Sequence, residues 1–139
     1  MDIGCGLGHF LNELRKLGYI NIHGIDISDE SVEACKAKGI FITKIDTIEK
    51  FAENSLIKYD FITMSHVLEH IEKINIIDTL ITIKSYLLAE SGSFVVMVPN
   101  AQSVTGAYWM YEDFTHTTLF TSGSIYYVLK SAGFQKISF

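Results

Sequence analysis

Several residue types are scarce in this chain of 139 residues, which has one proline, two cysteines and no run of basic residues. Cys5 and Cys35 are too few for a disulfide framework or a zinc ligand set, so a reducing compartment is expected. A formal net charge of −5 without a basic run argues against nucleic-acid binding. No hydrophobic run reaches the roughly eighteen residues that span a membrane. We therefore expect one soluble, cytoplasmic domain, residues 1–139, whose partners are small molecules.

Short apolar runs alternate with amphipathic stretches along the rest of the chain. The runs predict strands at residues 21–28, 40–46, 59–64 and 93–99, and a further strand beginning at 135–139. The stretches between them predict helices that end at Gly18 and Gly39, a long helix over 76–87 and a last helix over 122–132. Residues 93–99 are apolar throughout, which is typical of a strand buried on both faces. This alternation predicts a doubly wound, mostly parallel α/β sheet with helices on both faces.

The first ten residues, MDIGCGLGHF, place Gly4, Gly6 and Gly8 at alternate positions between a strand and a helix. Such a bare backbone lets a ligand approach the helix N-terminus closely. Asp26 ends the next strand, near the spacing at which an acidic residue binds ribose hydroxyls. A dinucleotide fingerprint, G-x-G-x-x-G, has its last glycine three residues after the second one. Three residues after Gly6 this chain has His9. The pattern therefore favours S-adenosylmethionine over a nicotinamide dinucleotide.

Motifs along almost the whole chain resemble those of the class I S-adenosylmethionine-dependent methyltransferases. The matching segments are MDIGCGLGHF, GIDIS, YDFITMSHVLEHI and LLAESGSFVVMVPN, in that order. The tail EDFTHTTLFTSGSIYYVLKSAGF further resembles methyltransferases that act on small molecules and in glycan biosynthesis. The resemblance implies a Rossmann-like sheet. Relative to that family the chain is expected to be a fragment, incomplete at both ends of the sheet.

The resemblance also implies roles for individual residues of the cofactor site. Asp2, Gly4 and Gly6 would shape the methionine end of the site, and Asp26 would hold the ribose. Asp46, after the third predicted strand, would lie near the adenine. Two further residues at the end of the fourth predicted strand, Ser65 and His66, would face the cofactor.

The segment HVLEH allows a rival interpretation, because His66, Glu69 and His70 form the H-x-x-E-H pattern of inverted zinc proteases. That pattern requires a helix around it and a third ligand downstream. Here it follows a buried strand directly and no third ligand is evident. We therefore expect no metal, and Glu69 and His70 would simply cap and solvate the start of a helix.

Residues 101–121 are expected to form a long loop on the substrate side, since long loops in compact domains usually serve function. His116 is the candidate general base, because the ordinary pKa of histidine suits proton removal near neutral pH. Tyr108, Trp109 and Tyr111 are candidate substrate contacts. For Trp109 and Tyr111 the alternative is that they are hydrophobic plugs. The expected activity is methyl transfer to a small molecule, at an oxygen of a sugar or related metabolite. The alternatives are a cofactor-binding domain without turnover and, third, a nicotinamide-dependent oxidoreductase.

Overall fold

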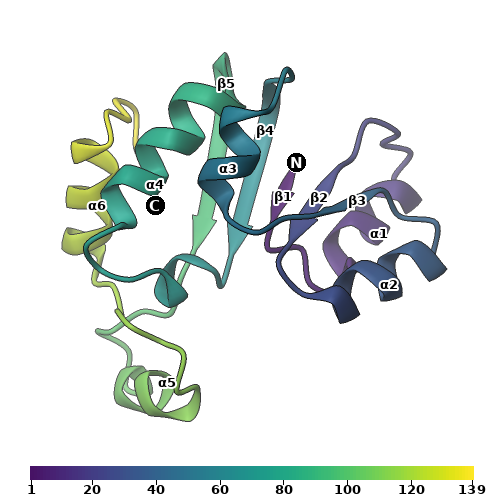
Figure 1. Cartoon of the computed structure of the whole chain (residues 1–139). Helices are drawn as coiled ribbons and strands as arrows, with labels where there is room; N and C mark the ends of the chain where they lie inside the picture. Colours follow the sequence, from purple (N-terminus) through teal and green to yellow (C-terminus); the bar gives the residue numbers. More distant parts are fainter.

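The computed structural model describes residues 1–139 and contains one sheet of five parallel strands (Figure 1). The strand order is β3-β2-β1-β4-β5. The strands are β1 (Asp2–Ile3), β2 (Gly24–Asp26), β3 (Ile42–Lys44), β4 (Tyr59–Ser65) and β5 (Leu88–Met97). The chain order reverses direction at β1, which pairs with both β2 and β4. The expected doubly wound α/β fold is confirmed, and its switch point lies at the glycine loop after β1.

Helices cover the sheet from two sides (Figure 1). They are α1 (His9–Lys16), α2 (Asp29–Ala37), α3 (Ile48–Glu53), α4 (Ile76–Thr82), α5 (Gly106–Glu112) and α6 (Ser122–Ser131), and α4 continues as a π-helical turn, Ile83–Leu87. The main core packs Ile3, Ile25 and Ile62 of the sheet with residues of α3, α4 and α6. A smaller core joins α1 and α2 to the opposite face through Leu11 and Cys35. No helix is long and apolar enough to cross a membrane.

Local side-chain hydrogen bonds set the starts of several helices. The Ser28 hydroxyl accepts a hydrogen bond from the Ser31 N–H at 3.3 Å and so caps α2. Thr121 and Ser124 form a reciprocal capping box at the start of α6. Two helices were not expected. Thr47 caps α3, and α5 occupies part of the stretch 101–121 for which only a loop was expected.

The expectation that residues 93–99 form a strand buried on both faces is wrong. β5 is the edge strand of the sheet, with β4 as its one neighbour. Phe94 and Val96 pack against the main core, whereas Val95 and Met97 on the other face are 40% and 54% exposed. A continuous apolar run therefore does not distinguish a central strand from an edge strand that is covered on one side.

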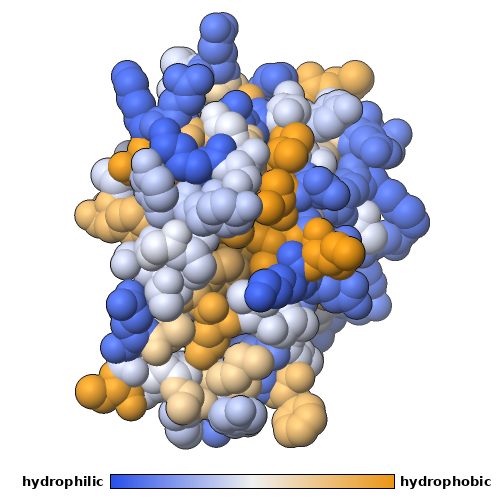
Figure 2. Space-filling view, turned by 90° about the vertical axis from the view of Figure 1, so that its left-hand side faces the viewer, coloured by the Kyte–Doolittle hydropathy of each residue, from blue (hydrophilic) through white to orange (hydrophobic).

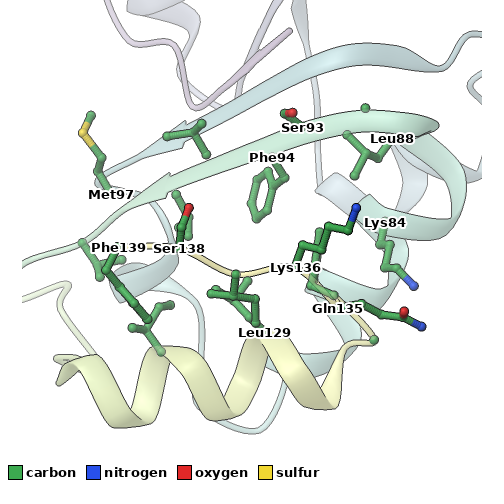
Figure 3. Close-up of a pocket in the computed structure, with 18 of the residues that line it drawn as sticks. Lys84, Leu88, Ser93, Phe94, Met97, Leu129, Gln135, Lys136, Ser138 and Phe139 are labelled. Atoms are coloured by element: carbon green, nitrogen blue, oxygen red, sulfur yellow. The ribbon is translucent and has the colours of Figure 1, made fainter.

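The expectation of a strand at residues 135–139 is also wrong, since this segment has no regular secondary structure. It packs through side chains instead. Phe134 stacks on Phe94 with ring centroids 5.5 Å apart, and Ile137 contacts the main core. The segment lies between β5 and α6 and lines, with them, a cavity of about 1370 Å³ (Figure 3). Apolar and hydrophilic residues intermingle on this side of the molecule (Figure 2).

Candidate functional site

The glycine loop after β1 is tied to the end of β2. The Gly4 N–H donates to the Ile25 carbonyl at 2.8 Å, and the Gly6 N–H donates to Asp26 Oδ2 at 2.8 Å. The two glycines differ in what surrounds them. A Cβ atom on Gly4 would lie 2.3 Å from Val67 Cγ2, whereas one on Gly6 would meet no atom within 4 Å. Gly4 is therefore required by packing, and Gly6 borders open space at the switch point.

Asp26 is the anchored carboxylate of this edge of the sheet. Its Oδ1 accepts the Ser28 N–H at 2.8 Å, its Oδ2 accepts the Gly6 N–H, and the residue is 8% exposed. A carboxylate oxygen has two lone pairs, so each oxygen retains one acceptor site. Two fixed acceptor oxygens beside a bare backbone suit the paired hydroxyls of a ribose. The structure thus brings together two of the residues that the sequence analysis assigns to the cofactor, Gly6 and Asp26.

Asp2 and Asp46 lie at different depths. Asp2 is buried, and its Oδ1 accepts a hydrogen bond from the Thr63 hydroxyl at 2.7 Å. Burial raises the pKa of the Asp2 carboxyl above its ordinary value. Asp46 follows β3. The N–H of the residue before it, Ile45, donates a hydrogen bond to the Asp26 carbonyl at 3.0 Å. Its carboxylate is exposed and pairs with Lys50 at 3.3 Å, so the structure does not bring it against the Asp26 carboxylate.

The segment after β4 lies against the glycine loop, where the side chain of Val67 packs on Gly4. His66 lies here with φ at 55°, the one non-glycine residue of the chain in the left-handed region. Such backbone strain is typical of functional sites. The N–H of His66 donates to the Met97 carbonyl at 3.0 Å, and its exposed ring contacts Glu69 Oε1 through Nδ1 at 3.1 Å. Ser65, directly before it, is partly buried.

A polar cluster made up of Glu69, His70 and residues 115–118 lies next to this segment. The 3-10 turn Leu68–His70 carries Glu69, which is fully buried, and residues 115–118 pack against it. The Glu69 carbonyl accepts hydrogen bonds from the Thr117 N–H and hydroxyl at 2.8 and 3.1 Å. The rings of His70 and His116 approach each other with centroids 4.7 Å apart. The structure thus brings the predicted base His116 to the predicted HVLEH segment.

The sequence interpretation missed the burial of Glu69 and its contact with Thr117. The signal available was the polar run THTT in a stretch otherwise rich in aromatic residues. Nothing in that run says which distant residue it contacts.

The aromatic residues predicted to contact substrate lie on α5, beyond the carboxyl ends of β4 and β5 (Figure 1). The rings of Tyr108 and Trp109 meet edge to face, with centroids 5.3 Å apart. All three predicted residues, Tyr108, Trp109 and Tyr111, are exposed. They therefore do not plug the core. The link from α5 to the polar cluster is the Trp109 carbonyl, which accepts a hydrogen bond from His116 Nδ1 at 2.6 Å.

The large cavity beside β5 does not coincide with the glycine loop. His66 lines it, but Gly6 and Asp26 do not.

Cys5, inside the glycine loop, has a thiol whose pKa is raised to about 12, chiefly by burial. A thiol held protonated is a poor nucleophile, so the loop supplies backbone and shape rather than covalent chemistry.

The fold and the glycine loop are of the Rossmann-like type found in S-adenosylmethionine-dependent methyltransferases. The chain belongs to the methyltransferase domain family, whose model matches residues 1–138. Among curated protein sequences none matches the chain significantly. The residues present fit the family's cofactor, since Gly6 leaves space for it and Asp26 has acceptor sites free.

Solved structures share this fold. An S-adenosylmethionine-dependent methyltransferase from Archaeoglobus fulgidus is 28% identical with a TM-score of 0.81, and the match covers 96% of this chain and 59% of that one. One from Thermotoga maritima is 21% identical with a TM-score of 0.75, covering 97% and 62%. An O-methyltransferase family protein from Burkholderia thailandensis is 13% identical with a TM-score of 0.76, covering 95% and 44%. The chain thus spans less than two thirds of each relative's length.

Proposed function

We propose that this chain carries the S-adenosylmethionine site of an enzyme that transfers a methyl group to an oxygen of a small molecule, a sugar or related metabolite. The observation that carries the proposal is the pairing of Gly6, open on its Cα side, with the anchored carboxylate of Asp26. The cofactor, when bound, supplies a methyl group made electrophilic by its sulfonium. The protein's own task is then to hold the two reactants in line, which contributes roughly 7–11 kcal/mol when orientation is good.

The residues of the proposed site divide into a cofactor side and an acceptor side, and the cofactor side lies around the glycine loop. Asp26 would accept hydrogen bonds from the ribose hydroxyls, and Asp2, Gly4 and Gly6 would shape the methionine end. Asp46, Ser65 and His66 would border the cofactor from the neighbouring strand ends.

The polar cluster and α5 form the acceptor side in this proposal, with Tyr108, Trp109 and Tyr111 contacting substrate. His116 is the candidate proton acceptor. Because its Nδ1 faces the Trp109 carbonyl, which only accepts hydrogen bonds, Nδ1 carries the proton and Nε2 of the neutral ring retains a lone pair. A hydroxyl acceptor must lose its proton, and a basic nitrogen next to the acceptor site suits that step. This favours oxygen over a neutral amine, which attacks without prior deprotonation.

The test separates binding from turnover. Calorimetry with S-adenosylmethionine and, in parallel, with a nicotinamide dinucleotide should show binding of the first alone. Mass spectrometry should then detect methylated product when hydroxyl-bearing metabolites are added. Binding without product from any acceptor would favour a cofactor-binding domain without turnover, and binding of the dinucleotide would overturn the proposal.

A further inference from the structure

We propose that Glu69, His70 and His116 bind one first-row transition-metal dication of the Zn²⁺ type. One ligand atom from each of these residues lies within 4.8 Å of the other two. The residues come from two distant segments, the turn after β4 and the stretch before α6. Glu69 and His70 belong to HVLEH, and His116 supplies the third ligand that this segment itself lacks.

Hydrogen bonds fix both imidazole rings in the form that a metal requires. His116 Nδ1 donates to the Trp109 carbonyl at 2.6 Å. His70 Nδ1 lies 2.7 Å from the Thr115 hydroxyl, whose own proton is directed to Asp113 Oδ1 at 2.6 Å. The Thr115 oxygen must therefore accept, and His70 Nδ1 must donate. In the neutral form, both rings therefore carry the proton on Nδ1 and keep a lone pair on Nε2. Outer partners of this kind orient metal-ligating histidines.

Glu69 supplies the independent sign of a missing partner. Its side chain is fully buried, Oε1 contacts His66, and Oε2 has no hydrogen-bond partner. The one other buried side-chain oxygen without a partner, Thr118 Oγ1, belongs to the segment that packs on Glu69. Leaving a buried carboxylate oxygen without a hydrogen-bond partner is unfavourable, because the oxygen loses its water and gains nothing in return. A cation between Glu69 and the two Nε2 atoms would satisfy it.

The ligand set indicates which cation would bind. Two imidazoles and one carboxylate suit Zn²⁺, Co²⁺ or Ni²⁺, whereas Mg²⁺ and Ca²⁺ prefer oxygen ligands throughout. Metal–ligand bonds near 2 Å in a tetrahedral site place ligands about 3.3 Å apart, so side-chain rotation must close the observed spacing. Three protein ligands leave a fourth position open, as in catalytic rather than structural zinc sites.

The metal site does not depend on the proposed methyl transfer, since cation binding needs neither cofactor nor acceptor. It does change the role of His116 within that proposal. The single lone pair of Nε2 cannot both coordinate a cation and accept a proton, so in the metal-bound protein His116 holds the ion.

Cobalt binding to the full chain tests the site without any activity measurement. Titration with Co²⁺ should give visible absorption saturating at one ion per chain, without the intense thiolate charge-transfer band that Cys5 or Cys35 would cause. Zn²⁺ should displace the Co²⁺ and Mg²⁺ should not. His116→Gln and His70→Gln should each weaken binding at least tenfold. The exposed His9 on α1 provides the matched control, and His9→Gln should bind like the wild type.

Folding of each variant is checked by circular dichroism. Because Glu69→Gln alters a buried group, Thr115→Val serves as a second probe: it removes the partner of His70 Nδ1 without touching a ligand and should weaken binding about tenfold. Absence of saturable Co²⁺ binding, or equal binding by His116→Gln and the wild type, would overturn the proposal. Calorimetry of S-adenosylmethionine on the same samples shows separately whether the cofactor site is intact.

Discussion

Gly6→Ala should separate the stability of the glycine loop from its contact with the cofactor. The backbone of Gly6 has φ at +50°, so alanine there should reduce the free energy of unfolding by about 1–2 kcal/mol, the penalty of the left-handed region. No steric part is added, because the new Cβ meets nothing within 4 Å. If the cofactor occupies that space, the methyl group should weaken its binding by about 1–3 kcal/mol, or roughly 5- to 160-fold.

Gly4→Ala is the matched control for Gly6→Ala, because it combines the same backbone penalty with a collision. Its Cβ would lie 2.3 Å from Val67 Cγ2, and its φ is +69°. The expected loss of stability is about 2–5 kcal/mol, the sum of the left-handed and overpacking penalties. In a Val67→Ala background the collision is gone, so Gly4→Ala should then lower stability by only about 1–2 kcal/mol.

Urea unfolding measures the stability differences, and calorimetry with S-adenosylmethionine measures affinity. The expected pattern is that Gly6→Ala binds more weakly than its small stability loss explains. An affinity equal to that of the wild type would show that no ligand approaches the Cα side of Gly6, and the placement of the cofactor would be refuted. An equal effect of Gly4→Ala in both backgrounds would refute the packing role of Val67.

Three further outcomes are expected. Asp26→Ala should weaken S-adenosylmethionine binding by about 2–3 kcal/mol, the strength of hydrogen bonds to a charged acceptor, and unchanged calorimetric affinity would remove Asp26 from the site. Burial lowers the pKa of His23 below its ordinary 6.5, so the unfolded state binds more protons and the free energy of unfolding should fall as the pH drops below that value. Urea titrations of His23→Gln should lack this component and those of His9→Gln should keep it. Thr121→Ala should reduce stability by about 1 kcal/mol in urea through loss of the α6 cap, and no change would contradict the capping role.

The strand–helix units around the glycine loop could be predicted from sequence because short-range signals determine them. Glycines at alternate positions and an N-cap such as Ser28 act within a few residues of themselves. The contact between Gly6 and Asp26 joins two consecutive strand–helix units, so the order of elements alone brings them together. The sheet topology follows from the same alternation, since parallel strands with helical crossovers have few permitted arrangements.

The parts that sequence could not predict depend on which surfaces meet. The apolar run of β5 gives the same signal for a central strand and for an edge strand with one covered face, and only strand order distinguishes them. Residues 135–139 have a strand-like composition, but their side chains pack into the space beside β5 without backbone pairing. The burial of Glu69 depends on residues 115–118, and no local pattern in either segment specifies the other.

The two sides of the site therefore differ in how firmly the fold holds them. The glycine loop is hydrogen-bonded to a strand whose neighbours lie in the main core. In contrast, α5 buries a single residue, Gly106, and its connection to the sheet runs through polar contacts such as those of Thr117 with Glu69 and of His116 with Trp109. Each contact of this kind contributes about 0.5–1.5 kcal/mol, so residues 101–121 are expected to open at lower free energy than the sheet. A ligand bridging Glu69 and His116 would add a bond between the turn after β4 and this segment. Binding there would then order the segment that carries the aromatic residues, while the glycine loop is organised before any ligand arrives.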